Sequence, residues 1–126
     1  MKSYNIHLIR HGFTAENLEG RYIGHTDVPL SEEGIEQIEN MKREYIYPYA
    51  DVVFTSPLSR CKETAKLIYP DAKTVVIDDL IEYNFGEFEG KTAQELEKSP
   101  VFPKWLAGEK GVEPPFGESN EKLLQI

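Results

Sequence analysis

The sequence predicts an α/β fold with a mostly parallel sheet and helices on both faces. Short β-prone runs alternate along the chain with segments whose apolar residues recur at helical spacing. An order of strand, helix, strand, helix, strand is typical of βαβ units, whose strands pair in parallel. The length of 126 residues suits one domain, and no shift in composition divides it, so we expect a single domain over residues 1–126.

The first half of the chain contains one expected strand and one expected long helix. Residues 4–9 form a β-prone run that ends at a charged turn containing glycine, and we expect the first strand there. Residues 13–30 have the glycine and proline content of a loop. Ser31 has the character of an N-cap, and the apolar spacing behind it predicts a helix from there to about Tyr45.

The second half continues the alternation. Residues 51–55 are apolar enough for a strand that is buried on both faces. Ser56 and Pro57 suit the N-cap and first position of a helix that runs to about Ile68. The remaining expected elements are a strand at 73–77, a short helix behind the capping box at 92–95, a helix at 101–107 and a helix that begins near Ser119.

Composition excludes several classes of protein. The 22 acidic and 14 basic residues give a net charge of −8, which argues against a nucleic-acid partner, because phosphates require a basic face. The single cysteine, Cys61, excludes a disulfide framework and a thiolate zinc site. No apolar run is long enough to span a membrane, and we see no targeting signal, so we expect a cytoplasmic protein without a membrane partner.

Reactive side chains follow each of the three expected strands. Arg10 and His11 come directly after the first, Arg60 lies in the opening turn of the helix after the second, and Glu82 follows the third. Ligands of parallel sheets bind beyond the carboxyl ends of the strands, so we expect these groups to meet at one rim. Guanidinium groups bind phosphoryl oxygens, a neutral imidazole can attack phosphorus, and a carboxylic acid can protonate the leaving group. The combination predicts phosphoryl transfer.

Each of these residues, taken alone, is more simply explained as a solvated surface group. Arg60 is a partial exception, because a cation near a helix N-terminus is unfavourable unless an anion lies between them. His7 is expected to be structural, and His25 lies in a loop that could fold over the rim. The functional interpretation depends on reactive side chains following all three expected strands.

Five collinear motifs, together with Asn17, resemble the histidine phosphatase superfamily, the phosphoglycerate mutase-like group. They are Leu8-Ile9-Arg10-His11-Gly12, Gly24-His25-Thr26-Asp27-Val28-Pro29-Leu30-Ser31, Thr55-Ser56-Pro57-Leu58-Ser59-Arg60, Glu82-Tyr83-Asn84-Phe85-Gly86-Glu87-Phe88-Glu89-Gly90 and Pro114-Pro115-Phe116-Gly117-Glu118-Ser119. The resemblance covers nearly the whole chain.

The resemblance implies a role for each matching residue. His11 would be the phosphorylated nucleophile, and Arg10 and Arg60 would bind the phosphoryl oxygens. Glu82 would donate the proton to the leaving group. Asn17 would add a phosphate contact, and Ile23 and Gly24 would line the substrate side. No metal and no cofactor are implied, because the arginines neutralise the phosphoryl charge.

Within this superfamily the segment 82–90 is closer to the phosphatase branch, and its short spacing to Pro114 favours a phosphomonoesterase that acts on a small phosphorylated metabolite. The loop 24–27 is similar to that of α-ribazole phosphatases, and broad-specificity relatives share it. Two alternatives stay open: phosphoryl transfer of the phosphoglycerate mutase type, and a non-catalytic fragment that binds phosphate.

Relatives in the superfamily continue into a further strand whose end supplies a second active-site histidine. The histidines here are His7, His11 and His25, and none stands in that context. We therefore expect a domain truncated at its C-terminus, without that strand and its helices. The strand before His11 would then be an exposed edge, and we expect either self-association through that edge or a fragment of a longer product.

Overall fold

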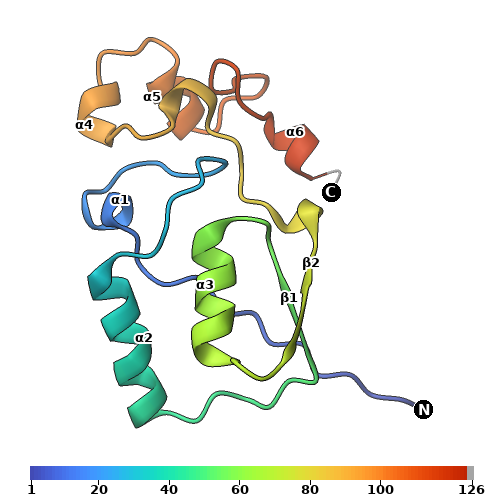
Figure 1. The fold of residues 1–126 in the computed structure, drawn as a ribbon. Helices are drawn as coiled ribbons and strands as arrows, with labels where there is room; N and C mark the ends of the chain where they lie inside the picture. Colours follow the sequence, from blue (N-terminus) through green and yellow to red (C-terminus); the bar gives the residue numbers. More distant parts are fainter. Residues whose placement is uncertain (125–126) are drawn as a thin grey trace.

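A computed structural model describes residues 1–124 of the chain. Two parallel strands lie beside helix α3, and α2 lies on the far side of α3 (Figure 1). The shorter helices gather beyond the carboxyl ends of the strands, in the upper part of Figure 1. No helix among the described residues has the length and apolar character needed to cross a bilayer.

The two strands of the sheet lie close to where the sequence predicts them. β1 comprises Val52–Thr55 and β2 comprises Lys73–Val76. They pair in parallel, from Val52 opposite Lys73 to Thr55 opposite Val76. The parallel pairing around a connecting helix confirms the predicted βαβ unit.

Helix α2, Glu32–Glu44, confirms the prediction for this segment. Its N-cap is Ser31, whose hydroxyl oxygen accepts a hydrogen bond from the Gly34 N–H at 3.0 Å. Two glutamates in the first turn and two basic residues in the last turn suit the helix dipole. Ile38 is buried on the side of the helix that faces the rest of the molecule.

Helix α3, Ser59–Ile68, begins two residues later than the Ser56-Pro57 signal predicts. The Ser56 hydroxyl does accept an N–H, from Leu58 at 3.2 Å, but it does so in the turn before the helix. Leu58 itself is the N-cap and offers no side-chain cap. Ser56 therefore caps the turn that precedes α3 and not the helix itself.

The prediction of a strand at residues 4–9 is wrong for the described structure. Residues 1–10 are all exposed and belong to no strand. The segment runs past the sheet without pairing with it (Figure 1). Apolar, β-prone residues still need a neighbouring backbone to form a ladder, and residues 1–124 provide none here. His7 is accordingly exposed and does not have the structural role expected of it.

β1 is not buried on both faces, as its continuous apolar run predicted. Its side chains alternate, with Thr55 buried and Phe54 61% exposed. Helix α3 packs against this strand, and Val52 and Phe54 lie on the uncovered face.

The upper part of the molecule is built from short elements around an aromatic core. Phe88, Leu96 and Phe102 are buried together, and Tyr22 and Trp105 pack against them. The elements of this part are η1 Asp78–Leu80, η2 Gly86–Phe88, α4 Ala93–Leu96, α5 Phe102–Leu106 and α6 Asn120–Leu123. The last three confirm the expected short helices, including the capping box at α4 and the N-cap at Ser119.

The segment 13–30, expected to be a loop, contains one helix that the sequence analysis missed. This helix, α1, comprises Ala15–Leu18 and begins with a capping box. The side chains of Thr14 and Asn17 each accept a hydrogen bond from the other residue's backbone N–H. Glutamine or glutamate usually completes such a box, and asparagine in that place gave a weaker signal.

Candidate functional site

The loop that carries His11 is anchored to both long helices. The Gly12 N–H donates to the Thr64 hydroxyl on α3 at 3.0 Å. The Phe13 carbonyl accepts from the Ser31 N–H at 2.9 Å and from the Ser31 hydroxyl at 3.0 Å, at the start of α2. These bonds tie the loop that carries His11 to the start of α2 and to the middle of α3.

Two glycines allow this loop to approach α2 closely. A Cβ at Gly34 would lie 2.1 Å from the Phe13 carbonyl oxygen, which is backbone and cannot move aside. A Cβ at Gly12 would lie 2.7 Å from Cδ1 of Ile38. The position of His11 therefore depends on glycine at position 34, whereas at Gly12 the end of the Ile38 side chain could shift to make room.

A single contact sets the tautomer of His11. Its Nδ1 lies 2.6 Å from the Gly12 carbonyl oxygen. A carbonyl oxygen can only accept a hydrogen bond, so the proton of a neutral ring resides on Nδ1. The lone pair is then on Nε2, the nitrogen that can attack an electrophile.

The surroundings of His11 lower its pKa below the ordinary value of 6.5. Burial of the half-buried ring is the largest cause, and the hydrogen bond to the Gly12 carbonyl opposes it. The positive charges of Arg60 and Arg10 lower the pKa further, and the carboxylate of Glu82 raises it. The charges of the three other predicted catalytic residues thus all act on this imidazole.

Arg60 is not a surface charge, because it is only 1% exposed. Its guanidinium donates to the Gly24 carbonyl at 2.7 Å and to the Thr26 carbonyl at 2.9 Å. No carboxylate of the described residues forms an ion pair with it, and its Nε is buried without a hydrogen-bond partner. A buried guanidinium with its charge unpaired and donors to spare is suited to bind an anion.

The segment 24–26 requires glycine at its first position. A Cβ at Gly24 would lie 1.7 Å from the Tyr83 carbonyl oxygen. The segment is also bound by Glu89, which accepts its backbone N–H groups. Sequence reasoning gave Glu89 no role, although it lies in one of the matching motifs. Its partners in the segment 24–26 lie more than 60 residues away along the chain, so no local pattern reveals them.

Two further carboxylates hold the loop before α2. Asp27 accepts the Ser59 N–H at 2.7 Å, and this bond to the first turn of α3 lowers the pKa of Asp27. It supplies the cap that Leu58 lacks. Glu63 accepts the Leu30 N–H at 2.8 Å. Neither role was predicted.

The other predicted residues lie around this centre with fewer contacts. The Asn17 amide oxygen accepts the Thr14 N–H at 3.0 Å, which leaves its NH₂ group as a donor. Ile23 is partly buried, and among the described residues neither it nor Asn17 hydrogen-bonds to His11 or Arg60. Glu82 is exposed, and its carboxylate accepts the Tyr83 N–H at 2.8 Å.

The arrangement combines a neutral imidazole with a free Nε2, two guanidinium groups and an accessible carboxyl group. Such a set can bind a phosphoryl group, attack it and protonate what leaves. Within residues 1–124, no three His, Cys, Asp or Glu side chains are grouped so that they could hold a metal ion.

Comparison with known proteins adds independent information. The sequence profile of the family described as "Histidine phosphatase superfamily (branch 1)" matches residues 6–125. An adenosylcobalamin/alpha-ribazole phosphatase of Escherichia coli (strain K12) is 34% identical over 122 residues, which cover 94% of this chain and 60% of that protein. A 2,3-bisphosphoglycerate-dependent phosphoglycerate mutase 2 of Gloeobacter violaceus is 36% identical over 122 residues, 89% of this chain and 54% of that protein.

A solved crystal structure has the same fold. The crystal structure of a putative alpha-ribazole-5'-P phosphatase from Escherichia coli superposes with a TM-score of 0.82 at 31% identity, over 93% of this chain and 60% of that one. The α/β, phosphoglycerate mutase-like fold predicted from the sequence is thereby confirmed. The chain spans about 60% of the length of this structure and of the alpha-ribazole phosphatase above.

Proposed function

Because this chain belongs to the histidine phosphatase superfamily, we propose that it is a phosphomonoesterase that acts through a phosphohistidine on His11. The observation that carries the proposal is the state of the His11 ring. Its Nδ1 hydrogen-bonds to the Gly12 carbonyl. Burial and the charges of two arginines lower its pKa. Such an imidazole stays neutral and has Nε2 free for attack on phosphorus.

The first half of the proposed reaction forms the phosphoenzyme. The lone pair of His11 Nε2 attacks phosphorus while the bond from phosphorus to the ester oxygen breaks. Arg10 and Arg60 bind the phosphoryl oxygens, whose charge grows in the transition state, and the NH₂ group of Asn17 adds a donor. The departing alkoxide takes a proton from the carboxylic acid of Glu82.

The second half regenerates the enzyme. Glu82, now a carboxylate, takes a proton from a water molecule that attacks phosphorus. The bond between phosphorus and Nε2 breaks, and the electron pair returns to His11. Inorganic phosphate leaves, and both residues are back in their starting protonation states.

The substrate class we propose is a small phosphorylated metabolite bound on the side of Ile23 and Gly24. The E. coli relative named as an alpha-ribazole phosphatase supports a phosphate ester of a small alcohol as the type of substrate.

Two alternatives differ from this proposal in the fate of the phosphoryl group. The similarity to a phosphoglycerate mutase supports transfer from the same phosphohistidine to a second hydroxyl group instead of water. The unpaired charge of Arg60 supports phosphate binding without turnover. Both use the residues described above.

The decisive experiment is hydrolysis of p-nitrophenyl phosphate by this chain and by His11→Ala, with His7→Ala as the matched control. We expect His11→Ala to abolish turnover and His7→Ala, which changes an exposed histidine, to retain it. An acid-labile phosphoprotein trapped from the wild type identifies the intermediate. Equal rates for the wild type and His11→Ala would refute the phosphohistidine mechanism. Phosphate binding with no hydrolysis by either protein would favour the non-catalytic alternative.

We also propose that copies of this chain associate through the exposed N-terminal segment and the neighbouring sheet. Leu8 is 96% exposed, Ile6 is 83% exposed and Phe54 on β1 is 61% exposed. Apolar, β-prone residues that have no pairing partner among residues 1–124 favour contact with another chain.

A further inference from the structure

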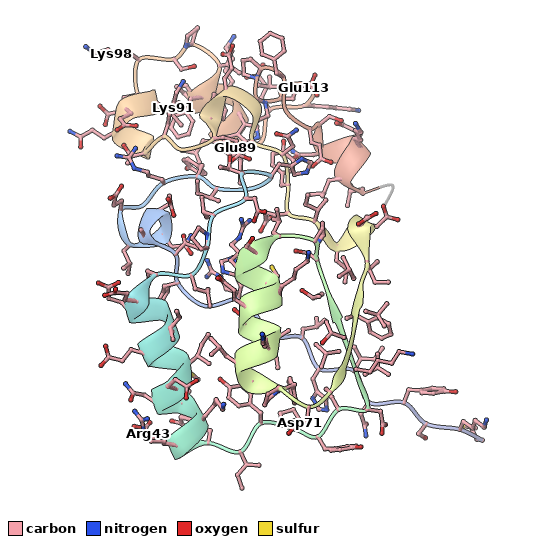
Figure 2. All side chains as sticks on the ribbon, in the orientation of Figure 1. Arg43, Asp71, Glu89, Lys91, Lys98 and Glu113 are labelled. Carbon is pink, nitrogen blue, oxygen red and sulfur yellow. The ribbon has the colours of Figure 1, made fainter. Side chains whose placement is uncertain are left out.

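Glu89 makes an unusual number of contacts for a carboxylate that is remote from His11 in sequence. Figure 2 shows it where the chain after η2 meets the segment 24–26. It accepts the Gly24 N–H at 2.9 Å, the His25 N–H at 2.8 Å and the Thr26 hydroxyl at 3.1 Å. Its carboxylate therefore binds three consecutive residues at once.

The same three residues bind Arg60 on their other side. The carbonyls of Gly24 and Thr26 accept the two bonds from the guanidinium, and the N–H groups of Gly24 and His25 donate to Glu89. The segment 24–26 thus lies between a negative and a positive group, bonded to each through its backbone. The Gly24 carbonyl and the His25 N–H belong to one peptide unit, so each charged group polarises that unit in the sense that strengthens the other group's bond to it.

In this arrangement the carboxylate of Glu89 compensates the charge of the buried Arg60 without direct contact between them. A buried charge without compensation is costly, and an ion pair with a carboxylate is the usual remedy. A direct pair would, however, occupy the donors that a phosphoryl group needs. Here no carboxylate of residues 1–124 pairs with Arg60, and its Nε remains without a partner.

We propose that Glu89 is a positioning residue, which fixes the Arg60 guanidinium for phosphate binding through the segment 24–26 and leaves its charge unpaired. Glu89 does not touch the substrate in this scheme. The inference rests on the proposed function, because it assumes that Arg60 binds the phosphoryl group.

The variant Glu89→Gln keeps the shape of the side chain, removes its charge and places an NH₂ group against backbone donors. We expect the Kd for inorganic phosphate to rise on the order of tenfold or more, and the KM for p-nitrophenyl phosphate to rise with it. The matched control is Glu87→Gln, two residues earlier, whose exposed side chain makes no hydrogen bond within the described residues. It should leave both constants unchanged, and an unchanged Kd in Glu89→Gln would overturn the proposal.

A double-mutant cycle separates positioning of Arg60 from general loosening of the loop. If Glu89 acts through Arg60, Glu89→Gln has no further effect on phosphate binding once Arg60→Ala is present. Losses that add in the double variant would overturn the proposal. Glu89→Asp keeps the charge on a shorter side chain, so we expect partial recovery of phosphate binding relative to Glu89→Gln. It also serves as the test variant if Glu89→Gln fails to fold.

The Nε–H signal of Arg60 in a nitrogen-resolved NMR spectrum tests the link without any need for phosphate. In Glu89→Gln we expect this buried proton to shift and to exchange faster with water, and in Glu87→Gln we expect neither change. An unchanged Arg60 signal in Glu89→Gln would refute the positioning role. If the wild type neither binds nor hydrolyses phosphate esters, the proposed function fails, and the Arg60 signal by itself decides whether Glu89 positions the guanidinium.

Discussion

His11 donates its Nδ1 proton to the carbonyl oxygen of Gly12, its own neighbour, across 2.6 Å. The contact is local, but the loop that makes it is held by bonds to Thr64 and Ser31, on two different helices. The ring is therefore oriented by the fold as well as by its adjacent residue. Which nitrogen is free for attack follows from this one hydrogen bond.

The lowered pKa of His11 predicts how activity depends on pH. A ring that resists protonation keeps its lone pair as the pH falls to 6.5, the ordinary pKa of histidine. We expect kcat/KM for p-nitrophenyl phosphate to keep its value down to about pH 6.5 and to fall only below it. An acid limb centred above pH 6.5, or a higher pKa for the NMR signal that disappears in His11→Ala, would contradict this.

The same shift makes a prediction about stability. The unfolded chain takes up a proton on His11 near pH 6.5, whereas the folded chain does so only at lower pH. The unfolded state then binds more protons, so the contribution of His11 to the free energy of unfolding is full above pH 6.5 and declines as the pH falls through 6.5 toward the folded pKa. Urea unfolding at several pH values should show a shallower decline in His11→Ala than in the wild type.

Glu82→Gln should discriminate between leaving groups. An alkoxide needs a proton as it departs, whereas p-nitrophenolate is a stable anion and does not. We expect kcat/KM for alkyl phosphates to fall on the order of 10²-fold or more, with a much smaller effect on kcat/KM for p-nitrophenyl phosphate. This ratio reports formation of the phosphoenzyme and not the later water attack, in which Glu82 acts as a base on every substrate. An equal fall in kcat/KM for both substrate types would argue against Glu82 as the proton donor.

Gly34→Ala should destabilise the protein, although alanine ordinarily favours a helix over glycine by about 1 kcal/mol. The new Cβ would lie 2.1 Å from the Phe13 carbonyl oxygen, and the resulting backbone shift costs about 1–3 kcal/mol. The shift also moves the loop of His11, so turnover should fall with the free energy of unfolding. The control is Gln37→Ala, an exposed position of α2. A gain in stability for Gly34→Ala would show that α2 and the loop are not in contact.

Self-association should appear as a concentration-dependent mass in light scattering. The exposed side chains of Ile6 and Leu8 provide the apolar contact, and Leu8→Lys should weaken it, because a lysine in an unpaired β-prone segment opposes pairing with another chain. The same substitution at an exposed polar position, Asn40→Lys on α2, is the control. A monomer at every concentration would contradict the proposal.

Several elements could be predicted because their signals lie within a few residues. The N-cap at Ser31 and the capping box at Thr92 each join groups three residues apart, and both appear in the structure. β1 and β2 were found from short runs of β-branched and aromatic residues. The start of α3 was misplaced because Ser56 satisfies the same kind of N–H donor in a turn as in a helix.

The sequence by itself determined the fold class, the family and the residues that carry reactive groups, because residue type and spacing along the chain are sufficient for these. Only the tertiary structure decided that residues 4–9 form no strand and that Arg60 is buried without an ion pair among the described residues. It also decided that Glu89 hydrogen-bonds to the segment 24–26, whose carbonyls bind Arg60. A strand requires a pairing partner, and the charge of a buried side chain requires compensation. Both depend on groups that are distant along the chain and meet only when it folds.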